Sequence, residues 1–154
     1  MSQGLRSLTP GQKAQRTAQW ARIMTKWLVT RSRRGGAKWQ VVNFNGPQGS
    51  ESVGIVDLLA IRKDHRAHKA GLKRGDLFET VFIQIKGGSA LRPTRQDVLR
   101  LSRVAKHYHA KAVVLAEWQR KKRLELFRLD KLQWTRVDPS VVFGGRTRSR
   151  NRER

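Results

Sequence analysis

The chain has 154 residues, no cysteine, and 34 Lys and Arg against 11 Asp and Glu, which gives a formal net charge of +23. This length suits a single domain with its own core. The lack of Cys excludes disulfides, thiolate metal sites and a cysteine nucleophile, and no segment approaches the ~18 apolar residues of a membrane-spanning helix. So large a positive charge is typical of a protein whose partners are polyanions, here nucleic acid rather than a membrane.

The first predicted element is an amphipathic helix that follows a flexible N-terminus of residues 1–8. Thr9, Pro10 and Gln12 have the form of a capping box with proline at the first helical position, and the glycine pair at 35–36 ends the helix. Apolar residues recur at spacings of three and four, namely Trp20, Ile23, Met24, Trp27 and Leu28. We expect this stripe to face the core, and base stacking by the two Trp is the alternative.

Five strands and a second helix are expected after the first helix. The strand patterns cover residues 38–44, 54–62, 77–86, 112–118 and 124–129. The second helix covers residues 94–109, where Pro93, Thr94 and Asp97 are start signals. The expected order is therefore α-β-β-β-α-β-β, in one α/β domain of residues 9–138.

The last part of the chain, residues 139–154, is predicted to be a disordered Arg-rich tail. After Gly144 and Gly145 it alternates Arg with Thr, Ser and Asn, a composition that cannot bury a core. Such a tail acts as a nonspecific phosphate clamp or only as a solubilising end. We favour the clamp because of the charge of the whole chain.

A polar cluster is expected where the second and third strands pair. If they are antiparallel partners joined by a symmetric loop, Asp57 lies opposite Gln84 and close to Lys86, at one end of otherwise apolar strands. An acid in such a strand costs several kcal/mol unless it is paired or binds a metal. Two interpretations remain open, a structural ion pair of Asp57 with Lys86 and a site for phosphodiester cleavage.

The two strands carry a recognisable motif, GIVDLLAI at residues 54–61 and VFIQIKGG at residues 81–88. This resembles the restriction-endonuclease-like PD-(D/E)xK nuclease superfamily, whose signature is an Asp on one strand and Glu/Asp-x-Lys on the next. Over roughly residues 10–118 the chain looks most like archaeal-type Holliday junction resolvases and small replication-repair nuclease modules. The resemblance implies a mixed sheet with helices on both faces.

The resemblance also implies a DNA-cleaving activity that depends on Mg²⁺ or Mn²⁺, structure-selective for branched or repair intermediates. Asp57, Gln84 and Glu51 are the candidate metal ligands, and Lys86 would position the attacking water. The chain departs from the family at Gln84, where relatives have Glu or Asp, and in its first helix, which has no acid. A noncatalytic DNA- or RNA-binding protein on this fold, or a basic ribonucleoprotein component, therefore remains the alternative.

Basic residues outside this cluster are expected to contact phosphates. They are Arg62, Lys63, Arg66, Lys69, Lys73, Arg74, Arg92, Arg95, Arg146, Arg148 and Arg150. DNA is favoured over RNA, a homodimer is compatible with junction cleavage, and the expected compartment is the cytoplasm or nucleoid with organellar targeting left open. Two acids outside the motif have simpler roles, since Glu117 is expected to pair with Arg120 more than to approach the site, and Glu79 is structural by strand parity.

Overall fold

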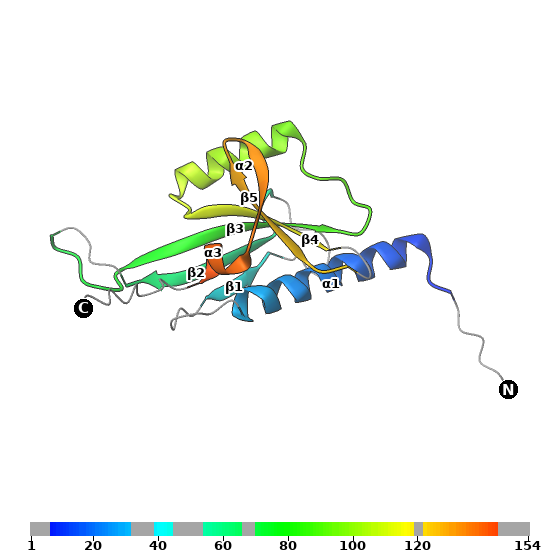
Figure 1. Ribbon diagram of the computed structural model, residues 1–154, viewed down its shortest axis with the longest axis horizontal. Helices are drawn as coiled ribbons and strands as arrows, with labels where there is room; N and C mark the ends of the chain where they lie inside the picture. The colour runs from blue at the N-terminus through cyan, green and yellow to red at the C-terminus, as the bar shows by residue number, and fades with distance from the viewer. Residues whose placement is uncertain (1–6, 32–38, 45–53, 66–69, 119–121, 145–154) are drawn as a thin grey trace, which may run out of the picture.

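The computed structural model describes residues 7–31, 39–44, 54–65, 70–118 and 122–144 (Figure 1). In chain order its elements are α1 (Pro10–Arg31), β1 (Gln40–Asn43), β2 (Leu58–Asp64), β3 (Leu77–Gly87), α2 (Arg95–His107), β4 (Ala112–Trp118), β5 (Glu125–Asp130), β6 (Gln133–Val137) and α3 (Pro139–Phe143). The expected order is confirmed as far as β5, whereas β6 and α3 were not expected. No helix among these residues is long and apolar enough to span a membrane.

The six strands form one sheet in the order in which they follow along the chain. Only β3 and β4 are parallel, and every other neighbouring pair is antiparallel. Parallel neighbours need a crossover connection, which α2 provides. The fold is therefore α/β with a mixed sheet, as the sequence predicted.

The expected register of β2 and β3 is confirmed, since Leu58 lies opposite Ile83 and Leu59 opposite Phe82. The strand boundaries differ from the prediction, because β2 begins at Leu58 and runs to Asp64. Residues 54–57 precede β2 and are not strand.

Helices cover both faces of the sheet (Figure 1). On one face, Val29 of α1 and Phe143 of α3 pack with strand residues such as Ala60 and Ile83. On the other face, Leu101 of α2 packs on Phe82 and Val113, the strand positions of opposite parity. The strands β2 to β6 thus contribute side chains to two separate cores, one on each face of the sheet.

The first helix begins as predicted but turns a different side to the sheet. Thr9 and Gln12 form the reciprocal capping box, with N···O distances of 2.9 and 3.2 Å. The buried residues are Ala21, Thr25 and Val29, whereas Trp20 and Trp27 are 48% and 55% exposed. The prediction that these two Trp face the core was wrong.

Close approach of backbones explains this orientation of α1. A Cβ placed on Gly87 would lie 3.4 Å from Cβ of Ala21 and 3.3 Å from the carbonyl oxygen of Thr17, and one on Gly88 would lie 3.1 Å from Cγ2 of Thr17. Small residues on the helix and glycines on the strand let the two elements pack tightly, which a Trp on that side would prevent.

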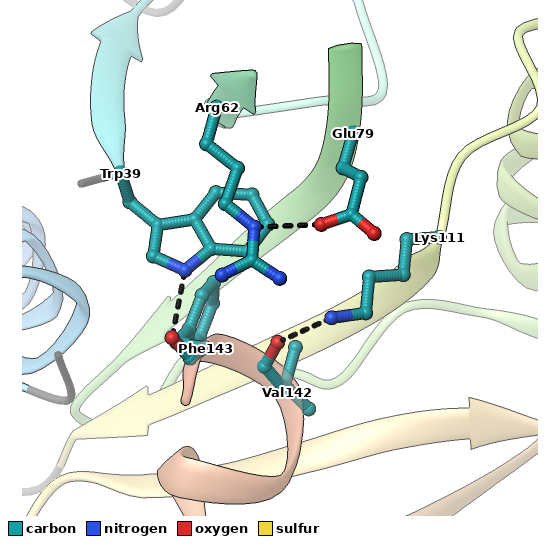
Figure 2. Close-up of polar contacts among 6 residues, drawn as sticks. All are labelled: Trp39, Arg62, Glu79, Lys111, Val142 and Phe143. Carbon is teal, nitrogen blue, oxygen red and sulfur yellow. Dashed lines mark hydrogen bonds and ion pairs between the residues drawn. The ribbon is translucent and has the colours of Figure 1, made fainter. Parts of the chain in front are cut away.

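The domain extends beyond its predicted end at residue 138. Pro139 is at the start of α3, capped by Asp138, and the Nε1 of Trp39 donates a 2.7 Å hydrogen bond to the carbonyl oxygen of Phe143 (Figure 2). The Nζ of Lys111 donates to the carbonyl of Val142 at 3.3 Å. Residues 139–144 therefore belong to the folded domain, because burial of Val142 and Phe143 outweighs the polar composition that follows. Residues 145–154 lie outside the described part.

Candidate functional site

The main chain around Asp57 is fixed to both of its neighbouring strands. Its N–H donates to the carbonyl of Ile83 at 3.1 Å, and its carbonyl accepts from the N–H of Phe44 at 3.3 Å. Its side chain turns to β3, where Oδ2 accepts a 2.7 Å hydrogen bond from the N–H of Ile85. The carboxylate thus adds a hydrogen bond between the two segments where β2 itself has ended, at the residue that follows Gln84.

Gln84 is the next member of the group. By alternation its side chain shares the α2 face of β3 with Phe82 and Lys86, and it pairs with Leu115 of β4 in the sheet. Its Oε1 is buried and has no hydrogen-bond partner among the described residues. An unsatisfied buried acceptor costs about 1–3 kcal/mol, so this oxygen is suited to a cation or a donor that binds there.

Lys86 lies near the C-terminal end of β3, where it contacts the parallel neighbour strand β4. It lies opposite Glu117 in the β3–β4 register, and its Nζ is 3.6 Å from Oε1 of Glu117, with the two side chains 11% and 14% exposed. Nζ also lies 3.5 Å from the carbonyl oxygen of Gly88. The ammonium group is therefore held by Glu117 and Gly88 rather than free in solvent.

Glu117 joins Lys86 to a second cation. Its Oε2 accepts a 2.9 Å hydrogen bond from Nε of Arg92, and the guanidinium of Arg92 lies over the ring of Phe127, 4.5 Å from the centroid. The sequence favoured Arg120 as the partner of Glu117, but Arg120 lies outside the described residues. Glu117 does approach Lys86, and its pairing with Arg120 stays a prediction. The parallel pairing of residues 86 and 117 was the missing signal.

The group offers a divalent cation a small set of hard oxygen ligands. Asp57 and Gln84 supply a carboxylate and an amide oxygen, while Glu51 lies outside the described part of the chain. Within the described part no three His, Cys, Asp or Glu cluster as a complete metal site. Mg²⁺ is commonly held by one or two carboxylates, with substrate phosphates and waters completing its shell, so these residues fit a substrate-completed site.

The predicted phosphate contacts fall into three groups. Lys63, Lys73, Arg74 and Arg95 are exposed, and Arg92 is 44% exposed although it is paired with Glu117. Arg66, Lys69, Arg146, Arg148 and Arg150 lie outside the described residues.

Arg62 is not available for a phosphate. Its Nε is 2.6 Å from Oε2 of Glu79, with a side chain 14% exposed, and its guanidinium lies over Trp39, 4.3 Å from the centroid (Figure 2). This part of the prediction needs correction, because strand parity turns Arg62 to the α1 face, where Glu79 is structural as expected.

Comparison of the chain with models of known families, with curated proteins and with solved structures found no match. The fold and the site define an α/β protein with a six-stranded mixed sheet and a partly buried polar group made by Asp57, Gln84, Lys86 and Glu117. The likeness to restriction-endonuclease-like nucleases therefore depends on the motif at residues 54–61 and 81–88 alone.

Proposed function

We propose that the protein binds DNA and hydrolyses its phosphodiester bonds with the help of Mg²⁺ or Mn²⁺. The observation that carries this proposal is the buried Oε1 of Gln84, which has no hydrogen-bond partner among the described residues. Gln84 directly precedes Ile85, whose N–H binds the carboxylate of Asp57. Two oxygen ligands of this kind suit a divalent cation, and a lysine two residues further along the strand suits the stabilisation of charge that develops on a phosphate. Buried amide oxygens usually have a hydrogen-bond partner, and among the buried side-chain atoms of the described residues only Arg128 Nε and Trp134 Nε1 share the lack of one.

In this proposal Asp57 and Gln84 would hold the cation together with the DNA phosphate. The metal supplies Lewis-acid polarisation of the phosphate and charge neutralisation. Because Gln84 is neutral, the two ligands bring one negative charge where a pair of carboxylates would bring two. We therefore expect a lower affinity for the cation, with assistance from the phosphate itself.

Lys86 has the second role, which is to orient the attacking water and offset the negative charge that develops on the phosphate. Glu117 is a positioning residue in this scheme, since it fixes the Lys86 ammonium at 3.6 Å. Arg92 holds Glu117 from the other side at 2.9 Å and, being 44% exposed, presents the rest of its guanidinium to solvent and to an approaching phosphate.

The net charge of the protein, rather than the shape of the site, is the reason to propose DNA as the substrate. A net charge of +23 favours the DNA backbone through counterion release. Lys73 and Arg74 on the β2–β3 connection and Arg95 at the start of α2 are exposed and available for backbone contacts. Such contacts position a strand without reading its sequence, so we expect little base specificity.

A noncatalytic DNA- or RNA-binding protein is the second candidate, and one contact favours it. Oδ2 of Asp57 accepts a hydrogen bond from the backbone N–H of Ile85, in the place of a backbone carbonyl of a paired strand. This structural role explains the acid without any metal. The two candidates therefore differ in what Asp57 does beyond closing the ladder.

The deciding experiment is incubation of labelled single-stranded, duplex and four-way-branched DNA with Mg²⁺ or Mn²⁺, with binding measured on the same samples. Asp57→Asn keeps an oxygen for Ile85 but loses the charge, and Lys86→Met removes the ammonium. Matched controls are Asp130→Asn and Lys106→Met at exposed positions. We expect both site variants to bind but not to cut, and both controls to cut. Tight binding without metal-dependent cutting by the wild type would leave the noncatalytic candidate.

A further inference from the structure

The outer side of α1 carries six exposed side chains in a single line. They recur at spacings of three and four residues, so they lie on one side of the helix. The line consists of Lys13, Arg16, Trp20, Ile23, Trp27 and Arg31. We call it the outer stripe of α1.

The outer stripe is distinct from the side of α1 that packs on the sheet. That side buries Ala21, Thr25 and Val29 completely, so the helix has two apolar stripes and the core uses only the smaller one. Trp20 and Trp27 are 48% and 55% exposed. Large aromatic side chains left at a surface in this way commonly mark an interaction site.

We infer that the outer stripe of α1 binds single-stranded nucleic acid, with bases stacked on Trp20 and Trp27 and phosphates held by the basic residues around them. Stacking of bases on aromatic rings inside a positively charged surface is the usual way in which proteins bind single strands without sequence preference. The guanidinium of Arg31 lies 4.9 Å from the ring centroid of Trp27. A positive charge therefore lies over one face of the Trp27 ring, so a base would stack on the other face with this charge close to its phosphate.

Charge distinguishes a nucleic acid from a second copy of this chain as the occupant. The helix contains Lys13, Arg16, Arg22, Lys26 and Arg31 and no acid. Two copies joined through the outer stripe would bring like charges together, with no carboxylate on either helix to offset them. A polyanion meets the same surface with complementary charge and releases counterions as it binds.

This surface is separate from the candidate cleavage site. The α1 and α2 helices pack on opposite faces of the sheet (Figure 1). Strand alternation puts Gln84 and Lys86 on the α2 face, together with Phe82. Trp20 and Trp27 are seven residues apart, which is about 10.5 Å along a helix. That distance corresponds to roughly three nucleotide steps at ~3.4 Å each, so a strand of four or more nucleotides could reach both rings.

The test is binding of a fluorescent 12-residue oligothymidylate in EDTA, where metal-dependent cleavage cannot contribute. Trp20→Leu with Trp27→Leu keeps the stripe apolar and the charge unchanged but removes the rings, and Trp20→Phe with Trp27→Phe keeps aromatic faces. Phe78→Leu is the control, since Phe78 is an aromatic residue 60% exposed on β3. We expect the Leu pair to bind at least about 25-fold more weakly, or fivefold for each ring. The Phe pair and the control should stay within about threefold of the wild type.

Equal affinity of the Leu pair and the wild type would overturn the inference. So would a wild-type dimer in sedimentation that the Leu pair abolishes while oligothymidylate binding persists, because the stripe would then join two copies. If the Leu pair does not fold, photocrosslinking of the wild type to a bromodeoxyuridine oligonucleotide decides. Adducts at Trp20 or Trp27 support the inference, and adducts confined to other residues contradict it. Because no metal is present, each result is independent of whether the protein cleaves DNA.

Discussion

Lys86 and Glu117 lie opposite each other on the two parallel strands at the centre of the sheet, with Nζ 3.6 Å from Oε1. This pair joins the proposed water-positioning lysine to the strand that follows the α2 crossover. Because Glu117 also accepts from Arg92, one carboxylate organises two cations at the edge of the site. The orientation of Lys86 therefore depends on a residue far from it in sequence.

Glu117→Gln should reduce cleavage more than it reduces DNA binding. The change removes the charge that holds Lys86 and leaves two cations close together, so we also expect a loss of about 1–3 kcal/mol in the free energy of unfolding. Urea denaturation and cleavage rates check the two effects. Glu125→Gln is the matched control, because Glu125 pairs with Arg136 at a much more exposed position and should cost less than about 1 kcal/mol. Equal effects of the two substitutions would contradict the role given to Glu117.

Gln84→Glu should make the protein respond more strongly to divalent cations. A second carboxylate beside Asp57 adds repulsion when no metal is bound, which lowers the thermal midpoint in EDTA. Added Mg²⁺ or Mn²⁺ should raise that midpoint, because a ligand that binds only the folded state stabilises it. Thermal unfolding with and without cation measures the difference. If the thermal midpoint of the variant does not change when cation is added, residue 84 is not part of a metal site.

Arg62→Ala should lower the stability of the protein, whereas Lys63→Ala should weaken its DNA binding, although the two residues are adjacent. Arg62 is paired with Glu79 at 2.6 Å inside the domain, so its loss should cost about 2–4 kcal/mol of stability. Lys63 is exposed, so its loss should leave stability unchanged and weaken DNA binding. The salt dependence of binding should fall by about one counterion for Lys63 if it contacts a phosphate. Unchanged stability of the Arg62 variant would contradict the buried pair.

Phe143→Ala should destabilise the domain by about 3–5 kcal/mol, although it lies in a segment whose composition suggests a tail. The ring is fully buried and meets Trp39 edge to face, with centroids 5.6 Å apart. Deletion of residues 145–154 is the contrasting change, which we expect to weaken salt-sensitive DNA binding and to leave stability largely intact. Urea denaturation of both variants tests whether the folded domain ends after α3, at residue 144. A Phe143 variant as stable as the wild type would show that α3 does not contribute to the core.

Local signals in the sequence were sufficient for several features. The capping residues around Thr9 and Thr94 predicted both long helices, and the structure contains both capping boxes. Loop closure between β2 and β3 predicted their register, in which Leu58 lies opposite Ile83, each next in sequence to Asp57 and Gln84 respectively.

Features that depend on contacts between distant segments could not be predicted in this way. Helical spacing could not choose between two apolar stripes on α1, because the choice depends on how closely Thr17 and Ala21 approach Gly87. The contact of Glu117 with Lys86 depends on the register of a crossover connection. The short helix α3 depends on burial of Val142 and Phe143 and on the hydrogen bonds that Trp39 and Lys111 donate to its carbonyls.

The central claim is that Asp57 and Gln84 hold a divalent cation, and its most direct test is a Mn²⁺ titration followed by NMR. In protein labelled with ¹⁵N and bound to a short DNA duplex, substoichiometric Mn²⁺ broadens signals close to where it binds. We expect the side-chain amide of Gln84 and the backbone amide of Ile85 to broaden first, and Asp57→Asn to abolish the effect. If the signals of these two groups stay sharp while others broaden, the result would contradict a metal site at Asp57 and Gln84.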